Sequence, residues 1–106
     1  MEISEIGDSS FESAVTNTKG LVLVDFWAPW CGPCKNLGTV LEELSTEFSG
    51  RATIVKLNVD DNSKISSQLK IRAVPTVVMF KDGQELSRQS GARPKLHFKD
   101  WILQNL

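Results

Sequence analysis

The chain of 106 residues holds only two cysteines, one histidine and no tyrosine, and its 12 basic side chains nearly balance its 13 acidic ones. A net charge of −1 provides no basic excess of the kind that binds nucleic acid or an anionic membrane surface. No apolar run approaches the roughly 20 residues that span a bilayer, and residues 1–5 lack the basic and apolar segments of a secretory signal. We therefore expect a cytoplasmic protein without nucleic-acid or membrane partners.

The length and composition predict a single domain over residues 1–106, with a monomer as the expected state. Apolar residues make up 41% of the chain, which is enough for one hydrophobic core. A domain of this size folds without disulfide or metal cross-links. In a reducing compartment, two lone cysteines close in sequence are more often catalytic than structural.

The two cysteines, Cys31 and Cys34, lie in the segment 30–34, Trp-Cys-Gly-Pro-Cys. An apolar run, 21–27, precedes this segment, and a stretch with helical spacing of apolar residues follows it up to Phe48. Two intervening residues let the sulfurs bond across the first turn of a helix, because positions i and i+3 share a face. The first thiol sits where unpaired N–H groups and the helix dipole favour an anion. Since the thiolate is the attacking species, this position favours Cys31 as the nucleophile.

Three functions fit such a cysteine pair. Reversible dithiol–disulfide exchange is favoured by the order of strand, Cys-x-x-Cys and helix. Half of a zinc site is the second, but zinc usually takes four Cys or His ligands, and the single histidine, His97, is more than sixty residues away. A structural disulfide is the third, although the chain-entropy model gives only about 2 kcal/mol for so short a loop.

The pattern of apolar residues and turn signals predicts an α/β arrangement. The first expected helix starts within 8–12, is capped by Ser10 or Asp8, and stops at Gly20. Further helices are expected at 31–48, at 62–69 and from Pro94. Strands are expected at 21–27, 52–59, 76–80 and 85–89, and the last two flank a turn at 81–84. Helices that join nearly continuous apolar strands imply a mostly parallel sheet with helices on both faces. The final hairpin adds an antiparallel edge.

Two charged residues interrupt the apolar strands. Asp25 in a doubly buried strand is costly unless it is paired or neutral. It is either a strand-end residue that reaches water or caps a helix, or a buried acid/base of raised pKa that exchanges a proton with Cys34. Lys56 interrupts the next strand, where its long side chain could also reach the surface. Pro75 cannot donate a ladder hydrogen bond and is expected just before a strand.

Taken together, these motifs resemble the thioredoxin family over essentially the whole chain. The resemblance rests on residues 25–35, Lys56, the triplet 74–76, the segment 80–83 and the pair 91–92. It implies a thioredoxin fold, with a five-stranded mixed central sheet flanked by four helices, and protein-disulfide reductase activity. The Gly-Pro dipeptide between the cysteines is typical of reducing members and argues against a disulfide oxidase or isomerase.

The resemblance also assigns roles to individual residues. Cys31 is the expected nucleophile, Cys34 the resolving thiol, Asp25 a buried acid/base with Lys56 near it, and Pro75 a cis proline facing the cysteines. The expected apolar docking surface around Cys31 comprises Trp30, Gly32, Pro33, Val59, Ala73, Val74, Gly91 and Ala92.

No metal and no cofactor are expected beyond the redox-active Cys31–Cys34 disulfide. The implied partners are a thioredoxin reductase and proteins that carry disulfides. The alternative is a thioredoxin-like binding subunit that stabilises a partner and whose thiols are incidental. The chain departs from the family pattern at Gly38-Thr39, because many members have a proline in place of Thr39.

Overall fold

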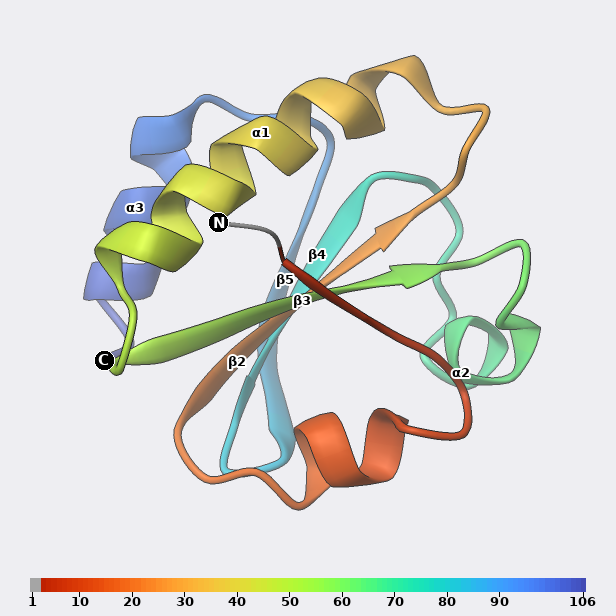
Figure 1. Cartoon of the computed structure of the whole chain (residues 1–106), viewed down its shortest axis with the longest axis horizontal. Helices are drawn as coiled ribbons and strands as arrows, with labels where there is room; N and C mark the ends of the chain where they lie inside the picture. Colours follow the sequence, from red (N-terminus) through yellow and green to blue (C-terminus); the bar gives the residue numbers. More distant parts are fainter. Residues whose placement is uncertain (1–2) are drawn as a thin grey trace.

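The computed structural model describes residues 3–106 and has a five-stranded sheet at its centre, in the order β1-β3-β2-β4-β5 (Figure 1). The strands are β1 (Ser4–Ile6), β2 (Leu21–Trp27), β3 (Ala52–Asn58), β4 (Thr76–Lys81) and β5 (Gln84–Ser90). The helices are η1 (Glu12–Thr16), a short π-helical segment, α1 (Gly32–Glu47), α2 (Ser63–Gln68) and α3 (Lys95–Leu103). The expected α/β fold, a mixed sheet with four helices, is confirmed.

Two apolar layers, one on each face of the sheet, form the core. Because side chains alternate along a strand, β2 divides its residues between both layers. One layer joins Leu21 and Leu23 to residues of α1 and α3, and the other joins Val22, Val24 and Phe26 to residues near η1 and α2. Asp25 continues the row of positions 21 and 23, which places it on the side of the sheet covered by α1.

The sheet is less parallel than the sequence suggests. β3 pairs in parallel with β1 and β2, but β4 runs antiparallel to both β2 and β5. The six-residue α2 spans about 9 Å at 1.5 Å per residue, whereas the seven-residue β3 spans about 23 Å. So short a helix does not return the chain along the length of the sheet, and β4 therefore starts at the end where β3 stops.

The N-terminal helix also differs from its prediction, because neither Ser10 nor Asp8 caps η1. Its first flanking residue is Phe11, which makes no side-chain capping bond. The carboxylate of Asp8 instead accepts hydrogen bonds from the backbone N–H groups of Lys64 (3.1 Å) and Ile65 (2.9 Å) in the first turn of α2. Asp8 is thus a capping residue for a helix more than fifty positions away.

We expect Asp8→Ala to lower the free energy of unfolding by about 1–2 kcal/mol, the usual effect of removing a capping carboxylate. Urea denaturation followed by circular dichroism measures this change. Glu12→Ala is the matched control, because it removes the same charge from an exposed position nearby. Equal stability of the two variants would show that the capping bonds contribute nothing.

Glycine turns join η1 to β2 and β4 to β5. Gly20 has φ +86° but lies beyond Asn17, the residue that follows the last turn of η1, so its predicted role as a helix stop is wrong. Its N–H donates to the Asp82 carboxylate (2.8 Å), and the Asp82 N–H donates to the Gly20 carbonyl (3.0 Å). Asp82 and Gly83 both have positive φ, as the predicted two-residue hairpin turn requires.

Candidate redox site

The cysteine pair lies at the N-terminus of α1, directly after β2. Cys31 has extended backbone angles (φ −89°, ψ 108°) and precedes the first helical residue. Its sulfur accepts a hydrogen bond from the backbone N–H of Cys34 at 3.2 Å. The two residues form a disulfide, with their Cα atoms 5.4 Å apart. Pro33 in the first turn has no N–H to leave unpaired, so it fits this position.

The two sulfurs differ in their surroundings rather than in their burial. Cys31 and Cys34 are each 5% exposed, so Cys34 is no deeper than Cys31 by this measure. Cys31, however, receives an N–H at the positive end of the α1 dipole, which stabilises a thiolate there. Cys34 lines a cleft that also contains Asp25. The nearest polar groups thus differ: Cys31 faces the helix N-terminus, and Cys34 faces a cleft that contains a buried carboxyl group.

This cleft, of about 250 Å³, lies between α1 and strands β2 and β3. Its lining residues are Asp25, Trp27, Ala28, Pro29, Cys34, Lys35, Gly38, Glu42 and Lys56. Polar groups line part of it, and its size is sufficient for water molecules. The structure therefore brings Asp25, Cys34 and Lys56 together, although they lie on three different elements.

Asp25 is a buried carboxyl group, with only 2% of the residue exposed. Its Oδ1 atom has no hydrogen-bond partner among the described residues 3–106. Burial raises the pKa of Asp25 from 3.8 to about 7; the positive charge of Lys56 opposes the rise, and the negative charge of Glu5 adds to it. A carboxyl group with this pKa can accept and release a proton near neutral pH. The surface-reaching interpretation of Asp25 is therefore wrong.

Lys56 lies beside Asp25 through the register of the sheet. In the strand register, Lys56 lies opposite Asp25 of β2 on one side and opposite Glu5 of β1 on the other. Its Nζ atom is 5.4 Å from the centroid of the Trp27 ring, and Trp27 Nε1 donates to the Glu5 carboxylate at 3.1 Å. Sequence reasoning missed Glu5, because only the pairing of β1 with β3 places it here.

A second hollow, of about 270 Å³, lies beside the exposed indole of Trp30. It is lined by Trp30, Val59, Ser66, Ile71, Arg72, Ala73 and Val74. Trp30 is 71% exposed, and its Nε1 donates to the Asp60 carboxylate at 3.4 Å. Val59 and Val74 also pack against the buried cluster that contains the two cysteines. Four of the predicted docking residues therefore surround one hollow next to the disulfide.

The other predicted docking residues lie next to Pro75 or at the start of α1. The Val74–Pro75 peptide bond is cis, and the Pro75 carbonyl accepts a hydrogen bond from the N–H of Gly91 at 2.9 Å. This bond brings Gly91, with its exposed neighbour Ala92, next to the proline. Gly32 and Pro33 are exposed in the first turn of α1.

His97 lies apart from the cysteines. It is half-buried on α3, and its Nε2 atom is 2.9 Å from the Gln89 side-chain oxygen. Within residues 3–106, no three His, Cys, Asp or Glu side chains gather as metal ligands. No helix in this part of the chain is long and apolar enough to cross a membrane.

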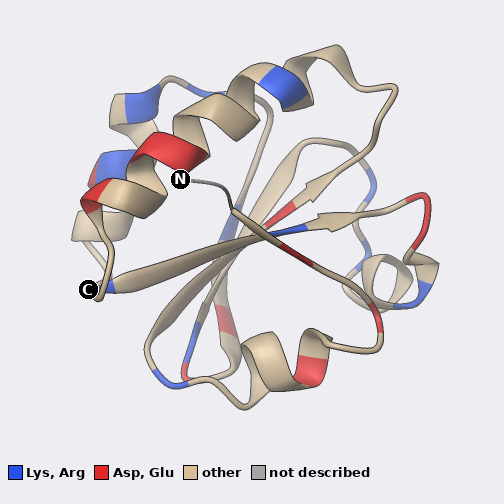
Figure 2. Ribbon diagram, in the orientation of Figure 1, with Lys and Arg blue, Asp and Glu red and all other residues tan. Residues whose placement is uncertain are grey.

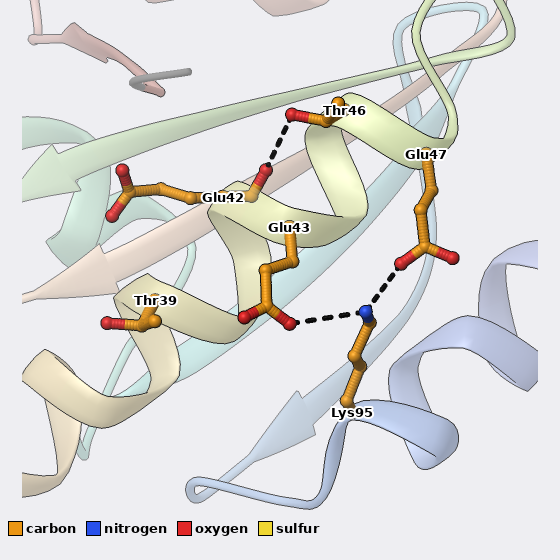
Figure 3. A pocket seen from close by; sticks show the side chains of 6 residues that line it. All are labelled: Thr39, Glu42, Glu43, Thr46, Glu47 and Lys95. Atoms are coloured by element: carbon orange, nitrogen blue, oxygen red, sulfur yellow. Dashed lines mark hydrogen bonds and ion pairs between the residues drawn. The ribbon is translucent and has the colours of Figure 1, made fainter.

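A third hollow, of about 480 Å³, lies away from the cysteines on α1 and α3 (Figure 3). Lys95 of α3 pairs there with Glu43 (3.2 Å) and Glu47 (2.6 Å) of α1. In Figure 2, acidic segments of α1 lie next to basic segments of α3. Lys95 pairs with two of the three carboxylates that line this hollow, and no cysteine lines it, so its size does not make it the reactive site.

Known proteins match this chain over nearly its whole length. A sequence model of the family described as Thioredoxin matches residues 2–104. A thioredoxin of Haemophilus influenzae is 47% identical over 105 residues, which cover 99% of this chain and 98% of that protein. A thioredoxin of Rickettsia felis is 41% identical over 99 residues, covering 93% and 94%. A chloroplastic M-type thioredoxin of spinach is 44% identical over 95% of this chain and 56% of its own length.

The site combines a disulfide at a helix N-terminus, on a mixed sheet, with a buried carboxyl group nearby. This combination defines a protein dithiol–disulfide oxidoreductase. The chain belongs to the thioredoxin family. Its activity is the reduction of protein disulfides.

Proposed function

We propose that Cys31 is the attacking thiolate and Cys34 the resolving thiol. Cys31 attacks one sulfur of a substrate disulfide, the other substrate sulfur leaves as a thiolate, and a mixed disulfide forms. Cys34 then loses its proton and attacks Cys31, which forms the intramolecular disulfide and releases the substrate as a dithiol. The observation that carries this assignment is the hydrogen bond from the Cys34 N–H to the Cys31 sulfur at the helix N-terminus.

Asp25 is the proposed acceptor of the Cys34 proton. Both side chains line the same cleft, and the pKa of about 7 suits a group that must take up and release a proton in each cycle. Lys56 acts on this carboxylate by its charge and keeps its pKa from rising further. We assign Lys56 a tuning role because, within residues 3–106, the two side chains form no ion pair.

The proposed docking surface is the apolar rim of the hollow beside Trp30. Within residues 3–106, neither the N–H nor the carbonyl of Val74 makes a backbone hydrogen bond, so both can pair with an extended substrate segment. Exposed small residues in the rim let a second backbone approach closely. The predicted rim residues are Gly32, Pro33, Val59, Ala73, Val74, Gly91 and Ala92, with Pro75 at its base.

Family members work with a reductase and with disulfide-bearing proteins. We propose that a thioredoxin reductase recycles the Cys31–Cys34 disulfide, that this pair is the only redox group, and that no cofactor takes part. The protein acts as a cytoplasmic monomer that carries electrons, because a reducing compartment keeps such a pair available as thiols.

Brief alkylation of the reduced, native protein tests the two cysteine roles. We expect iodoacetamide to modify Cys31 at least about tenfold faster than Cys34, because only the Cys31 thiolate is stabilised by the helix N-terminus. Mass spectrometry of digested protein locates the label. In denaturant the two rates should become similar. Equal labelling of both cysteines in the native protein would contradict the assignment.

A further inference from the structure

Glu42 is a carboxylate that the mechanism above does not use, yet it lines the same cleft as Asp25 and Cys34. Cys34, Gly38 and Glu42 are four positions apart along α1, so they follow one another on one face of the helix. This row extends from the resolving cysteine towards the middle of α1. The cleft therefore has a buried carboxyl group from the sheet and a second carboxyl group from the helix.

Glu42 is set apart from the other acidic residues of α1. Glu43 and Glu47 are both paired with Lys95, whereas Glu42 makes no ion pair within residues 3–106. Figure 3 shows the Glu42 side chain extending away from Lys95 and out over the strands of the sheet. Its carboxylate is thus free to interact with water in the cleft.

Gly38 keeps the space between Cys34 and Glu42 open. A Cβ atom built at Gly38 meets no atom within 4 Å, so the missing side chain corresponds to empty room rather than to a close contact. Gly38 itself lines the cleft. Water can therefore occupy the helix face between the two polar residues.

Among the charged groups around Asp25, Glu42 is the carboxylate that is placed to exchange protons with it. Lys56 approaches from β3, Glu5 from β1, and Lys35 and Glu42 from α1. Glu5 accepts a hydrogen bond from Trp27 and is not part of the cleft lining. Since Asp25 is 2% exposed, its proton must leave through the cleft.

We propose that Glu42 is the outer proton acceptor of this cleft and serves the resolving step through Asp25. The inference rests on the proposed roles of Cys34 and Asp25. The Cys34 thiol gives its proton to the Asp25 carboxylate, and the Cys34 sulfur then forms the disulfide with Cys31 while the substrate thiolate leaves. The protonated Asp25 passes its proton to a water molecule, which passes a proton to the Glu42 carboxylate and from there to solvent. Glu42 is a positioning residue, because it touches neither sulfur.

The reaction of reduced protein with dithiobis(nitrobenzoate) separates the steps. Attack by Cys31 releases one nitrothiolate, and resolution by Cys34 releases the second, so stopped-flow absorbance shows two phases. Below pH 7 Asp25 is mostly protonated and must first lose its proton through the cleft. We expect Glu42→Gln to slow the second phase by about tenfold at pH 6 and to leave it unchanged at pH 8.5. Glu43→Gln, which removes the neighbouring carboxylate, should match the wild type at both pH values.

Two further results distinguish a proton relay from a simple charge effect. Removing a negative charge near Asp25 would lower its pKa and speed the second phase at pH 6, which is the opposite of the expected change. Acetate, a small carboxylate, should restore the rate of Glu42→Gln as its concentration rises. Gly38→Leu, which fills the opening, should also slow the second phase at pH 6, and acetate should not restore it.

The inference is overturned if Glu42→Gln and Glu43→Gln have equal second-phase rates at pH 6, if Glu42→Gln is faster, or if acetate does not rescue it. In an Asp25→Ala background, Glu42→Gln should have no further effect, because the relay acts through Asp25. The first phase reports attack by Cys31 alone. Loss of that phase in the wild type would refute the proposed function, whereas its retention with an unaltered second phase in Glu42→Gln would refute only the relay.

Discussion

Replacement of Cys31 by serine is expected to reduce the acceleration of insulin reduction by dithiothreitol to the uncatalysed background. The serine hydroxyl is almost fully protonated at neutral pH and has no adjacent base, so it does not attack a disulfide. Precipitation of the freed insulin chains, followed as turbidity, measures the rate. The variant keeps the size and position of the side chain, and its circular dichroism should match that of the reduced wild type.

Cys34→Ser is the matched variant for the second step. It retains the Cys31 thiolate and should therefore attack a substrate disulfide once, after which the mixed disulfide accumulates and is detected by mass spectrometry. The two roles would be reversed if Cys34 in Cys31→Ser formed a mixed disulfide faster than Cys31 does in Cys34→Ser. If the folded, reduced wild type did not accelerate insulin reduction, a binding subunit with incidental thiols would instead be favoured.

Local signals in the sequence were sufficient to predict the elements that carry the disulfide. The apolar run of β2 and the helical spacing after Cys34 predict the boundary at which the cysteines lie, and the structure has it there. The turn at Asp82-Gly83 was equally predictable, because two successive residues with positive φ favour that dipeptide. In each case the deciding interactions are between residues close in sequence.

Interactions between distant residues were not predictable in this way. Asp8 carries every local mark of a cap for the helix that follows it, but the N–H groups it accepts from belong to α2. The direction of β4 depends on how far α2 carries the chain, and the position of Glu5 beside Lys56 depends on strand register. Glu42 was within reach of sequence reasoning, because it is eight positions after Cys34 and therefore on the same helix face.

Asp25→Ala is expected to gain stability relative to the wild type as the pH rises from acid to alkaline values. Below pH 3.8 the carboxyl group is protonated in both the folded and the unfolded chain, so folding incurs no ionisation penalty. As pH rises from 3.8 to about 7, the unfolded chain ionises while the folded chain holds its proton, and stability falls. Above pH 7 the buried group is also ionised and the loss is complete. The rise in pKa corresponds to about 4 kcal/mol.

Urea unfolding of oxidised wild type and Asp25→Ala at pH 3.5 and pH 8.5 measures this contribution. The cavity left by the substitution affects both pH values equally, so the change in the stability difference between them isolates the carboxyl group. We expect that change to be about 4 kcal/mol in favour of the variant at pH 8.5. Asp61→Ala removes an exposed carboxylate and should show no comparable change.

The same Asp25→Ala protein should release substrate from the mixed disulfide more slowly, because Cys34 has lost its proton acceptor. A less stable variant with unchanged turnover would show that Asp25 supports the fold and not the chemistry.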